Sequence, residues 1–218
     1  MHPRHSHNQS SPHLRPPIFT DTFASTSLSP KKPTLVHNRT MTATLNFRIA
    51  TENDVIPLEH LINTAFRDDK TTQVFLSTDH ADIAVTDIPT LRAKLNQPGS
   101  AVLVATDTAT GTLVAHCSVR KLDDHRAWFG MLAVDISHQN RGIGGHALSR
   151  AEQYARREWG SSRLEFDVVN TRAELLAWYQ LRGYRRTGET RPFPYERHEG
   201  WEGVLRDDLC FVILGKDI

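Results

Sequence analysis

The sequence predicts a mixed α/β domain over residues 46–218, preceded by a polar tail of residues 1–45. Short β-rich runs alternate along residues 46–218 with apolar residues at helical spacing, which is typical of a mixed α/β chain. The composition, with 39% hydrophobic and 23% charged residues, is that of an ordinary globular protein. No apolar run approaches the ~18 to 20 residues of a membrane span, so we expect no membrane-spanning segment and no membrane partner.

The first half of the domain predicts one strand, two helices and a hairpin. A strand is expected over 47–50, and residues 51–54 then offer N-cap side chains to a helix with one apolar face. The apolar positions of this helix are Val55, Leu58, Leu61, Ile62, Ala65 and Phe66. A second helix is expected over 89–96. Strands over 101–106 and 112–119 flank a turn-rich segment, which indicates a hairpin.

The second half predicts four strands and two helices, one of them after a glycine-rich turn. The expected elements are a strand over 128–134, a helix from Ile143 to Gly160, a strand over 164–169, a helix over 173–181 that Gly183 ends, a short strand over 184–187 and a terminal strand over 209–214. The predicted order is therefore β-α-α-β-β-β-α-β-α-β-β.

Charge and cysteine content exclude several classes of protein. Lys and Arg (26) balance Asp and Glu (25), so the chain lacks the positive field of a nucleic-acid-binding protein. Cys117 and Cys210 are the only cysteines, which excludes a disulfide framework and a four-cysteine zinc site. We expect a cytoplasmic protein with no bound metal.

The tail of residues 1–45 has a composition typical of a disordered segment. It holds five Lys or Arg against one acidic residue, six of the eleven prolines and five of the twelve histidines. Its basic, hydroxyl-rich character also fits a mitochondrial presequence, although the prolines oppose the amphipathic helix of such signals. A further interpretation is that translation starts at Met41.

The segment from Gln139 to Gly145 is the candidate binding motif. It lies between a predicted strand and a predicted helix, and Gly142, Gly144 and Gly145 carry no side chain that would block the first free N–H groups of that helix. Backbone donors and the helix dipole together suit a phosphate or pyrophosphate. The alternative is a flexible turn in which glycine supplies a positive φ.

Two known phosphate-binding motifs do not fit this segment. A Walker loop requires lysine and serine or threonine at the helix start, and His146 follows the glycines instead. The letters from Gly142 to Ala147 match the dinucleotide fingerprint G-x-G-x-x-A. In that fold, however, the first glycine directly follows the strand, whereas here residues 135–141 intervene and repeated β-α-β units are lacking.

Residues 131–145, MLAVDISHQNRGIGG, resemble the acetyl-CoA signature of the GNAT superfamily of acyl-CoA N-acyltransferases, whose pattern is Q/R-x-x-G-x-G/A. Gln139, Gly142 and Gly144 occupy its fixed positions. Residues 170–184, NTRAELLAWYQLRGY, are similar to the later segment Asn-x-x-Ala…Tyr-x-x-x-Gly-Phe/Tyr of the family. The resemblance implies a GNAT-type fold, in which helices flank a mixed, mostly antiparallel sheet and strands four and five splay apart.

The resemblance also implies acetyl-CoA as co-substrate and a set of residues that bind it. The backbone of strand four would bind the pantetheine arm, and the amides of the glycine segment would bind the pyrophosphate. Asn170 would contact the pantetheine amides or, alternatively, cap the following helix. The complete expected set is Leu132, Ala133, Val134, Gln139, Asn140, Arg141, Gly142, Ile143, Gly144, Gly145 and Asn170.

Tyr179 aligns with the tyrosine that protonates the departing thiolate in many family members, and the alternative is that its ring simply packs. The family's general base would lie near Trp128 or Gly130, and neither side chain can accept a proton. Glu165, Asp167 and His116 are other ionisable residues on the predicted strands, for which we expect structural roles. A water chain, or an amine of low pKa, would then suffice.

The implied activity is transfer of an acetyl group from acetyl-CoA to a primary amine. The resemblance assigns acceptor specificity to residues 67–86 and 191–206, where carboxylates and aromatic residues favour a small amine, amino acid or polyamine. A protein N-terminus or a lysine side chain is the main rival acceptor. The alternative function, favoured by the missing base on strand four, is a non-catalytic acyl-CoA-binding or sensor domain.

Overall fold

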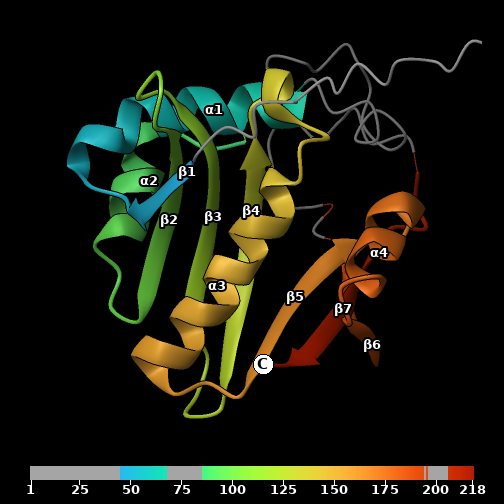
Figure 1. The fold of residues 1–218 in the computed structure, drawn as a ribbon. Coiled ribbons are helices and arrows are strands. Elements are labelled where there is room, and N and C mark those ends of the chain that lie inside the picture. Colours follow the sequence, from blue (N-terminus) through green and yellow to red (C-terminus); the bar gives the residue numbers. More distant parts are fainter. Residues whose placement is uncertain (1–44, 68–84, 194, 196–205) are drawn as a thin grey trace, which may run out of the picture. The chain divides into compact units, whose positions relative to one another are not determined.

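The computed structural model describes residues 45–67, 85–193, 195 and 206–218. Within these ranges the elements follow the predicted order (Figure 1). The strands are β1 (Leu45–Ile49), β2 (Ser100–Asp107), β3 (Leu113–Lys121), β4 (Arg126–Val134), β5 (Arg163–Val169), β6 (Arg185–Pro192) and β7 (Cys210–Asp217). The helices are α1 (Val55–Arg67), α2 (Ile88–Leu95), α3 (Ile143–Trp159), α4 (Ala173–Gln180) and the short 3-10 helices η1 (Glu52–Asp54) and η4 (Ile136–His138). The predicted disordered tail lies outside the described residues, apart from Leu45.

Local sequence accounts for the ends of two helices. The Asp87 side chain accepts a hydrogen bond of 2.8 Å from the backbone N–H of Thr90 and so caps α2. Gly142 (φ 81°) begins α3 and Gly160 (φ 65°) ends it, both in the left-handed region that glycine adopts readily. None of the described helices has the length and apolar character that a membrane crossing requires.

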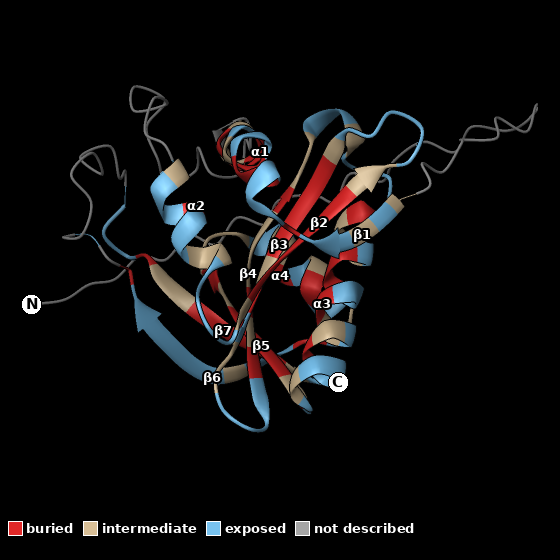
Figure 2. Ribbon diagram, turned by 90° about the vertical axis from the view of Figure 1, so that its left-hand side faces the viewer, coloured by how far each residue is buried: buried red, intermediate tan, exposed pale blue. Residues whose placement is uncertain are grey.

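The predicted strand over 184–187 was too short and began one residue early. β6 extends from Arg185 to Pro192 and lies at the edge of the sheet, exposed along nearly its whole length (Figure 2). It pairs antiparallel with β7, from Arg185 opposite Gly215 to Pro192 opposite Cys210. Backbone pairing rather than an apolar face defines this strand, so hydrophobic periodicity could not reveal its length.

The strands form one sheet in the order β1-β2-β3-β4-β5-β7-β6. All neighbouring pairs are antiparallel except β4 and β5, which are parallel. The parallel pairing joins only Arg126–Trp128 to Arg163–Glu165, whereas β4 stays paired with β3 as far as Val134. β4 and β5 therefore separate beyond Trp128, as Figure 1 shows, and the predicted splay is confirmed.

Helices cover both faces of the sheet (Figure 2). We call the two sides the α1–α2 face and the α3–α4 face. On the α3–α4 face, Leu148 and Tyr179 belong to one buried cluster with Phe129 and Phe166 of the strands. On the α1–α2 face, the buried helix residues include Leu58, Ile62 and Leu91, which pack with Val102, Val104 and Ala133. Because side chains alternate along a strand, neighbouring residues of β4 and β5 point to opposite faces.

Candidate functional site

The opening between β4 and β5 is bordered by an irregular stretch of β4. In the register with β3, His116 faces Ala133 and Ser118 faces Gly130, so Met131 and Leu132 together oppose Cys117. This is a β-bulge, and Met131 adopts a positive φ of 52°, which is uncommon for a residue other than glycine. The bulge redirects β4 at the point where β5 has moved away.

Beyond the bulge, β4 has no paired strand among the described residues on the side that faces β5. The N–H of Asp135 donates to the carbonyl of Val114 on β3, so by strand alternation the backbone groups of Val134 point away from β3. The Val134 carbonyl accepts a hydrogen bond of 3.2 Å from Nε2 of Gln139. Gln139 therefore ties the loop that follows β4 back to the strand, a role that its place in the sequence motif did not reveal.

The loop between β4 and α3 is held by its own polar side chains. Oδ1 of Asp135 lies 2.8 Å from Nδ1 of His138, and the hydroxyl of Ser137 contacts both residues. Asn140 (φ 60°) and Gly142 (φ 81°) then turn the chain into the helix. The first intrahelical bond runs from His146 N–H to the Gly142 carbonyl, so the preceding amides of the first turn lack helix partners.

The glycines of α3 face the end of β4 and helix α4. A Cβ placed on Gly144 would lie 3.6 Å from Trp178, 3.7 Å from Leu132 and 3.8 Å from Val134. A Cβ placed on Gly145 would lie 3.4 Å from the guanidinium of Arg182. The predicted residues of β4 and of the glycine segment are thus brought together, with the free first-turn amides of α3 beside the end of β4.

Arg182 and Trp178 belong to this site although the sequence motifs did not identify them. The guanidinium of Arg182 stacks on the Trp178 ring and donates a hydrogen bond of 2.9 Å to the Trp178 carbonyl. This contact holds a positive charge next to the first turn of α3. The only signal in the sequence was their spacing of four residues, which places both on one side of a helical turn.

Tyr179 lies under the opening on the α3–α4 face. It is 5% exposed, and its ring centroid lies 4.2 Å from that of Phe166. Burial raises the pKa of Tyr179 well above its ordinary value, so the hydroxyl is protonated at physiological pH. The positive charges of Arg172 and Arg182 oppose this rise in the pKa of Tyr179, and the Cys117 thiol adds to it. The Tyr179 ring packs in the core, as one of the two interpretations expected. Its protonated hydroxyl is also able to donate a proton, and this acid role stays a prediction.

Asn170 does not cap α4, which corrects one of the two sequence interpretations. The helix begins at Ala173 with Arg172 at the N-cap position and no side-chain cap. The amide of Asn170 instead donates to the carbonyl of Asp208 (3.0 Å) and accepts from the N–H of Cys210 (3.2 Å). A contact between Asn170 and the pantetheine stays a prediction, and it would use this same amide.

The α1–α2 face of the opening carries Trp128 and Gly130 from β4 and Glu165 and Asp167 from β5. Glu165 is mostly buried and pairs with Arg163 (2.7 Å) and Arg126 (3.4 Å), which gives it the structural role expected. In the described part of the chain, Asp167 has one ionic contact, with Arg191 at 3.9 Å. The Arg191 guanidinium in turn lies 4.4 Å from the centroid of the Trp128 ring.

His116 is a buried neutral imidazole on the α1–α2 face. Burial first, and then the positive charge of Lys94, lower the pKa of His116 to about 3. The backbone of Leu103 acts in the opposite direction, but neither ring nitrogen has a hydrogen-bond partner among the described residues. His116 opposes Ala133 in the β3–β4 register and lies next to the bulge.

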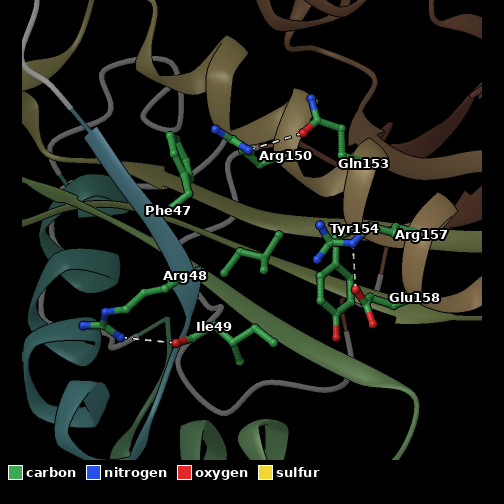
Figure 3. A pocket seen from close by; sticks show the side chains of 9 residues that line it. Phe47, Arg48, Ile49, Arg150, Gln153, Tyr154, Arg157 and Glu158 are labelled. Atoms are coloured by element: carbon green, nitrogen blue, oxygen red, sulfur yellow. Dashed lines mark hydrogen bonds and ion pairs between the residues drawn. The ribbon is translucent and has the colours of Figure 1, made fainter.

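A separate groove of about 350 Å³ lies between β1 and α3 (Figure 3). Its lining residues are Phe47, Arg48, Ile49, Leu103, Arg150, Gln153, Tyr154, Arg157 and Glu158. None of them belongs to the predicted site. The predicted acceptor loops, 67–86 and 191–206, lie outside the described residues except for 67, 85–86, 191–193, 195 and 206.

Comparison with known proteins gives one family match and many structural matches. The model of the Acetyltransferase (GNAT) family matches residues 58–184. No curated protein sequence matches this chain.

Three solved structures illustrate the structural matches, and all show the fold alone because their sequence identity is low. The ribosomal-protein-alanine N-acetyltransferase of Brucella melitensis is 20% identical, with a TM-score of 0.58 over 79% of this chain and 99% of its own. The PaiA N-acetyltransferase of Thermoplasma acidophilum, in complex with coenzyme A, is 14% identical with a TM-score of 0.62 over 80% and 99%. A variant of spermidine N-acetyltransferase from Vibrio cholerae is 14% identical with a TM-score of 0.58 over 79% and 93%.

Proposed function

Because the chain belongs to the GNAT acetyltransferase family, whose model spans more than half of its length, we propose that it transfers the acetyl group of acetyl-CoA to a primary amine. The observation that carries this proposal is the opening between β4 and β5, which lies next to the free first-turn amides of α3. Coenzyme A carries a diphosphate on a long, hydrogen-bonding arm, and the two features suit these two parts of the molecule.

The residues around the opening have the chemistry to hold coenzyme A. The amides from Ile143 to Gly145 would bind the diphosphate, and the side chains of Arg141 and Arg182 would add positive charge. The part of β4 from Leu132 to Val134 would bind the pantetheine arm with those backbone groups that point away from β3, since β5 no longer pairs with it. When bound, acetyl-CoA supplies the activated acetyl group.

Direct attack by the amine fits this arrangement, because both substrates can meet at one opening. Tyr179 lies beneath that opening with a protonated hydroxyl and would donate a proton to the departing sulfur. The acceptor would be a small amine, amino acid or polyamine, with a protein N-terminus or a lysine side chain as the rival. The carboxylate of Asp167 on the α1–α2 face supports a positively charged acceptor.

Calorimetry and thiol release test the proposal together. We expect coenzyme A to bind with measurable heat and to raise the melting temperature. We also expect thiol release from acetyl-CoA in the presence of at least one of spermidine, tyramine and an alanine-initiated hexapeptide. A well-folded protein that shows neither heat nor a rise in melting temperature would refute the proposal.

A second candidate function is a non-catalytic acyl-CoA-binding or sensor domain. It is favoured by Trp128 and Gly130, because β4 offers no side chain at the opening that can accept a proton. Tight binding of acetyl-CoA without acetylation of any amine in a broad panel would support this function.

A further inference from the structure

Asp167 of β5 and Gly130 of β4 occupy corresponding positions beyond the last paired residues of the two strands. The last parallel pair of β4 and β5 is Trp128 with Glu165. Two residues further along each strand, and therefore on the same face, come Gly130 and Asp167. These two residues are the first on the α1–α2 face beyond the point where the strands separate.

Gly130 has no side chain, so β4 itself does not fill the space on the α1–α2 face at this position. Within 4 Å, the only atom of the described residues that a Cβ on Gly130 would meet is the indole nitrogen of Trp128, at 3.9 Å. On the other side of Gly130, Ser118 of β3 is its register partner, and the buried hydroxyl of Ser118 has no hydrogen-bond partner among the described residues. The Ser118 hydroxyl on β3 and the Asp167 carboxylate on β5 thus belong to the strands on either side of Gly130. The Arg191 guanidinium lies on the same face, 4.4 Å from the centroid of the Trp128 ring, so an amine that reaches Asp167 would take the place of this loosely held cation.

Among the described residues, the carboxylate of Asp167 has a single, loosely held ionic partner. Its side chain is 32% exposed, and its ionic partner Arg191 lies at 3.9 Å, the outer limit of an ion pair. Burial raises the pKa of Asp167 above its ordinary value, and Arg191 offsets part of this rise. The nearest acidic residue on the same face, Glu165, is neutralised by arginines, and the β7 partner of Asp167 is the apolar Ile213.

We propose that Asp167 is the general base that removes a proton from the ammonium group of the acceptor. This inference rests on the proposed acetyl transfer and narrows its substrate to primary amines that are protonated in solution. The base is supplied by β5, across the opening from the strand-four positions that lack one.

Asp167 and Tyr179, which lie on opposite faces of the sheet, together account for the protons that move in the reaction. Asp167 takes one proton from the acceptor's ammonium group and later releases it to solvent. The freed lone pair forms the new C–N bond as the C–S bond of the thioester breaks. Tyr179 delivers a proton to the departing sulfur and recovers one from the newly bonded nitrogen. Tyr179 contacts Phe166, the residue before Asp167, so acid and base approach the opening from opposite faces.

The test is the pH dependence of the Asp167→Asn protein, with spermidine and tyramine as probes. At pH 7 we expect kcat/KM to fall ~10²- to 10³-fold, with coenzyme A affinity unchanged. The deficit should shrink toward pH ~10, where the amines lose their proton without help. A purely structural role would not produce this convergence.

Chemical rescue and a matched control complete the test. Formate should restore part of the activity of Asp167→Ala, because a small carboxylate can enter the vacated space. Glu165→Gln, on the same strand and face, should keep the pH profile of the wild type. Wild-type activity and an unchanged profile in Asp167→Asn would overturn this inference alone. A wild-type protein that acetylates no amine would overturn the proposed function and this inference with it.

Discussion

The guanidinium of Arg182 stacks on the indole of Trp178, with its central carbon 3.6 Å from the ring centroid. The same guanidinium borders Gly145 in the first turn of α3. Stacking limits the freedom of this long side chain, so its charge is fixed beside the helix terminus that attracts anions.

Replacing Arg182 with glutamine should weaken coenzyme A binding about 5- to 20-fold, because one cation near the diphosphate is lost while the backbone amides remain. Calorimetric titration measures the change. The wild type should also lose more affinity than the variant when salt is raised, since screening acts on the lost charge. Arg185→Gln, on the exposed strand β6, is the control. An unchanged Kd would show that Arg182 does not face the diphosphate.

Replacing Gly144 with phenylalanine should reduce coenzyme A binding ~100-fold or more, because a large side chain would fill the space between α3, β4 and α4. Gly144→Ala is the matched control. Its Cβ would make ordinary contacts of 3.6 to 3.8 Å with Trp178, Leu132 and Val134 and should cost little. Melting curves of the free proteins separate lost binding from lost folding. Normal binding by the phenylalanine variant would place the cofactor elsewhere.

Hydrophobic periodicity and capping residues were enough to predict most of the fold. The helix expected from Ile143 to Gly160 is α3, because its apolar face and its two glycines are local signals. β6 was underestimated, since an exposed edge strand has no apolar pattern and depends on backbone pairing with β7. The splay of β4 and β5 was expected only through family resemblance, because strand pairing is a property of distant segments.

The parts of the candidate site that are contiguous in the sequence could be predicted, whereas the parts that the fold brings together from distant segments could not. The glycine segment at the start of α3 is contiguous in the sequence. Arg182 is not, because spacing alone does not show that the end of α4 returns to Gly145. Alternation on β5 distinguished Glu165 from Phe166 but did not say which face meets the acceptor. The arginine pairs of Glu165 and the looser contact of Asp167 separate the two carboxylates only in three dimensions.

Replacing Tyr179 with phenylalanine should lower kcat ~10²- to 10³-fold and leave coenzyme A affinity intact. The ring contacts with Phe166 and Trp178 persist in the variant, so the fold should be retained, and only the proton donor is lost. Steady-state thiol release gives kcat, and calorimetry gives the affinity. Tyr154→Phe, which changes a hydroxyl at the β1–α3 groove, is the control. Full turnover in the Tyr179 variant would leave packing as the role of this residue.

Replacing Asp54 with asparagine should destabilise the protein by ~1 to 2 kcal/mol at pH 7. The two terminal guanidinium nitrogens of Arg48 each lie 2.7 Å from an oxygen of the Asp54 carboxylate, and these hydrogen bonds lower the pKa of Asp54 from 3.8 to about 2. A lowered carboxyl pKa contributes stability that is complete above pH ~4 and is lost as the pH falls toward 2. Urea unfolding of both proteins should therefore show a gap that closes between about pH 4 and pH 2. Asp124→Asn, whose carboxylate is 90% exposed, should show no gap, and a gap for Asp54→Asn that persists at pH 2 would mean that charge pairing with Arg48 is not its cause.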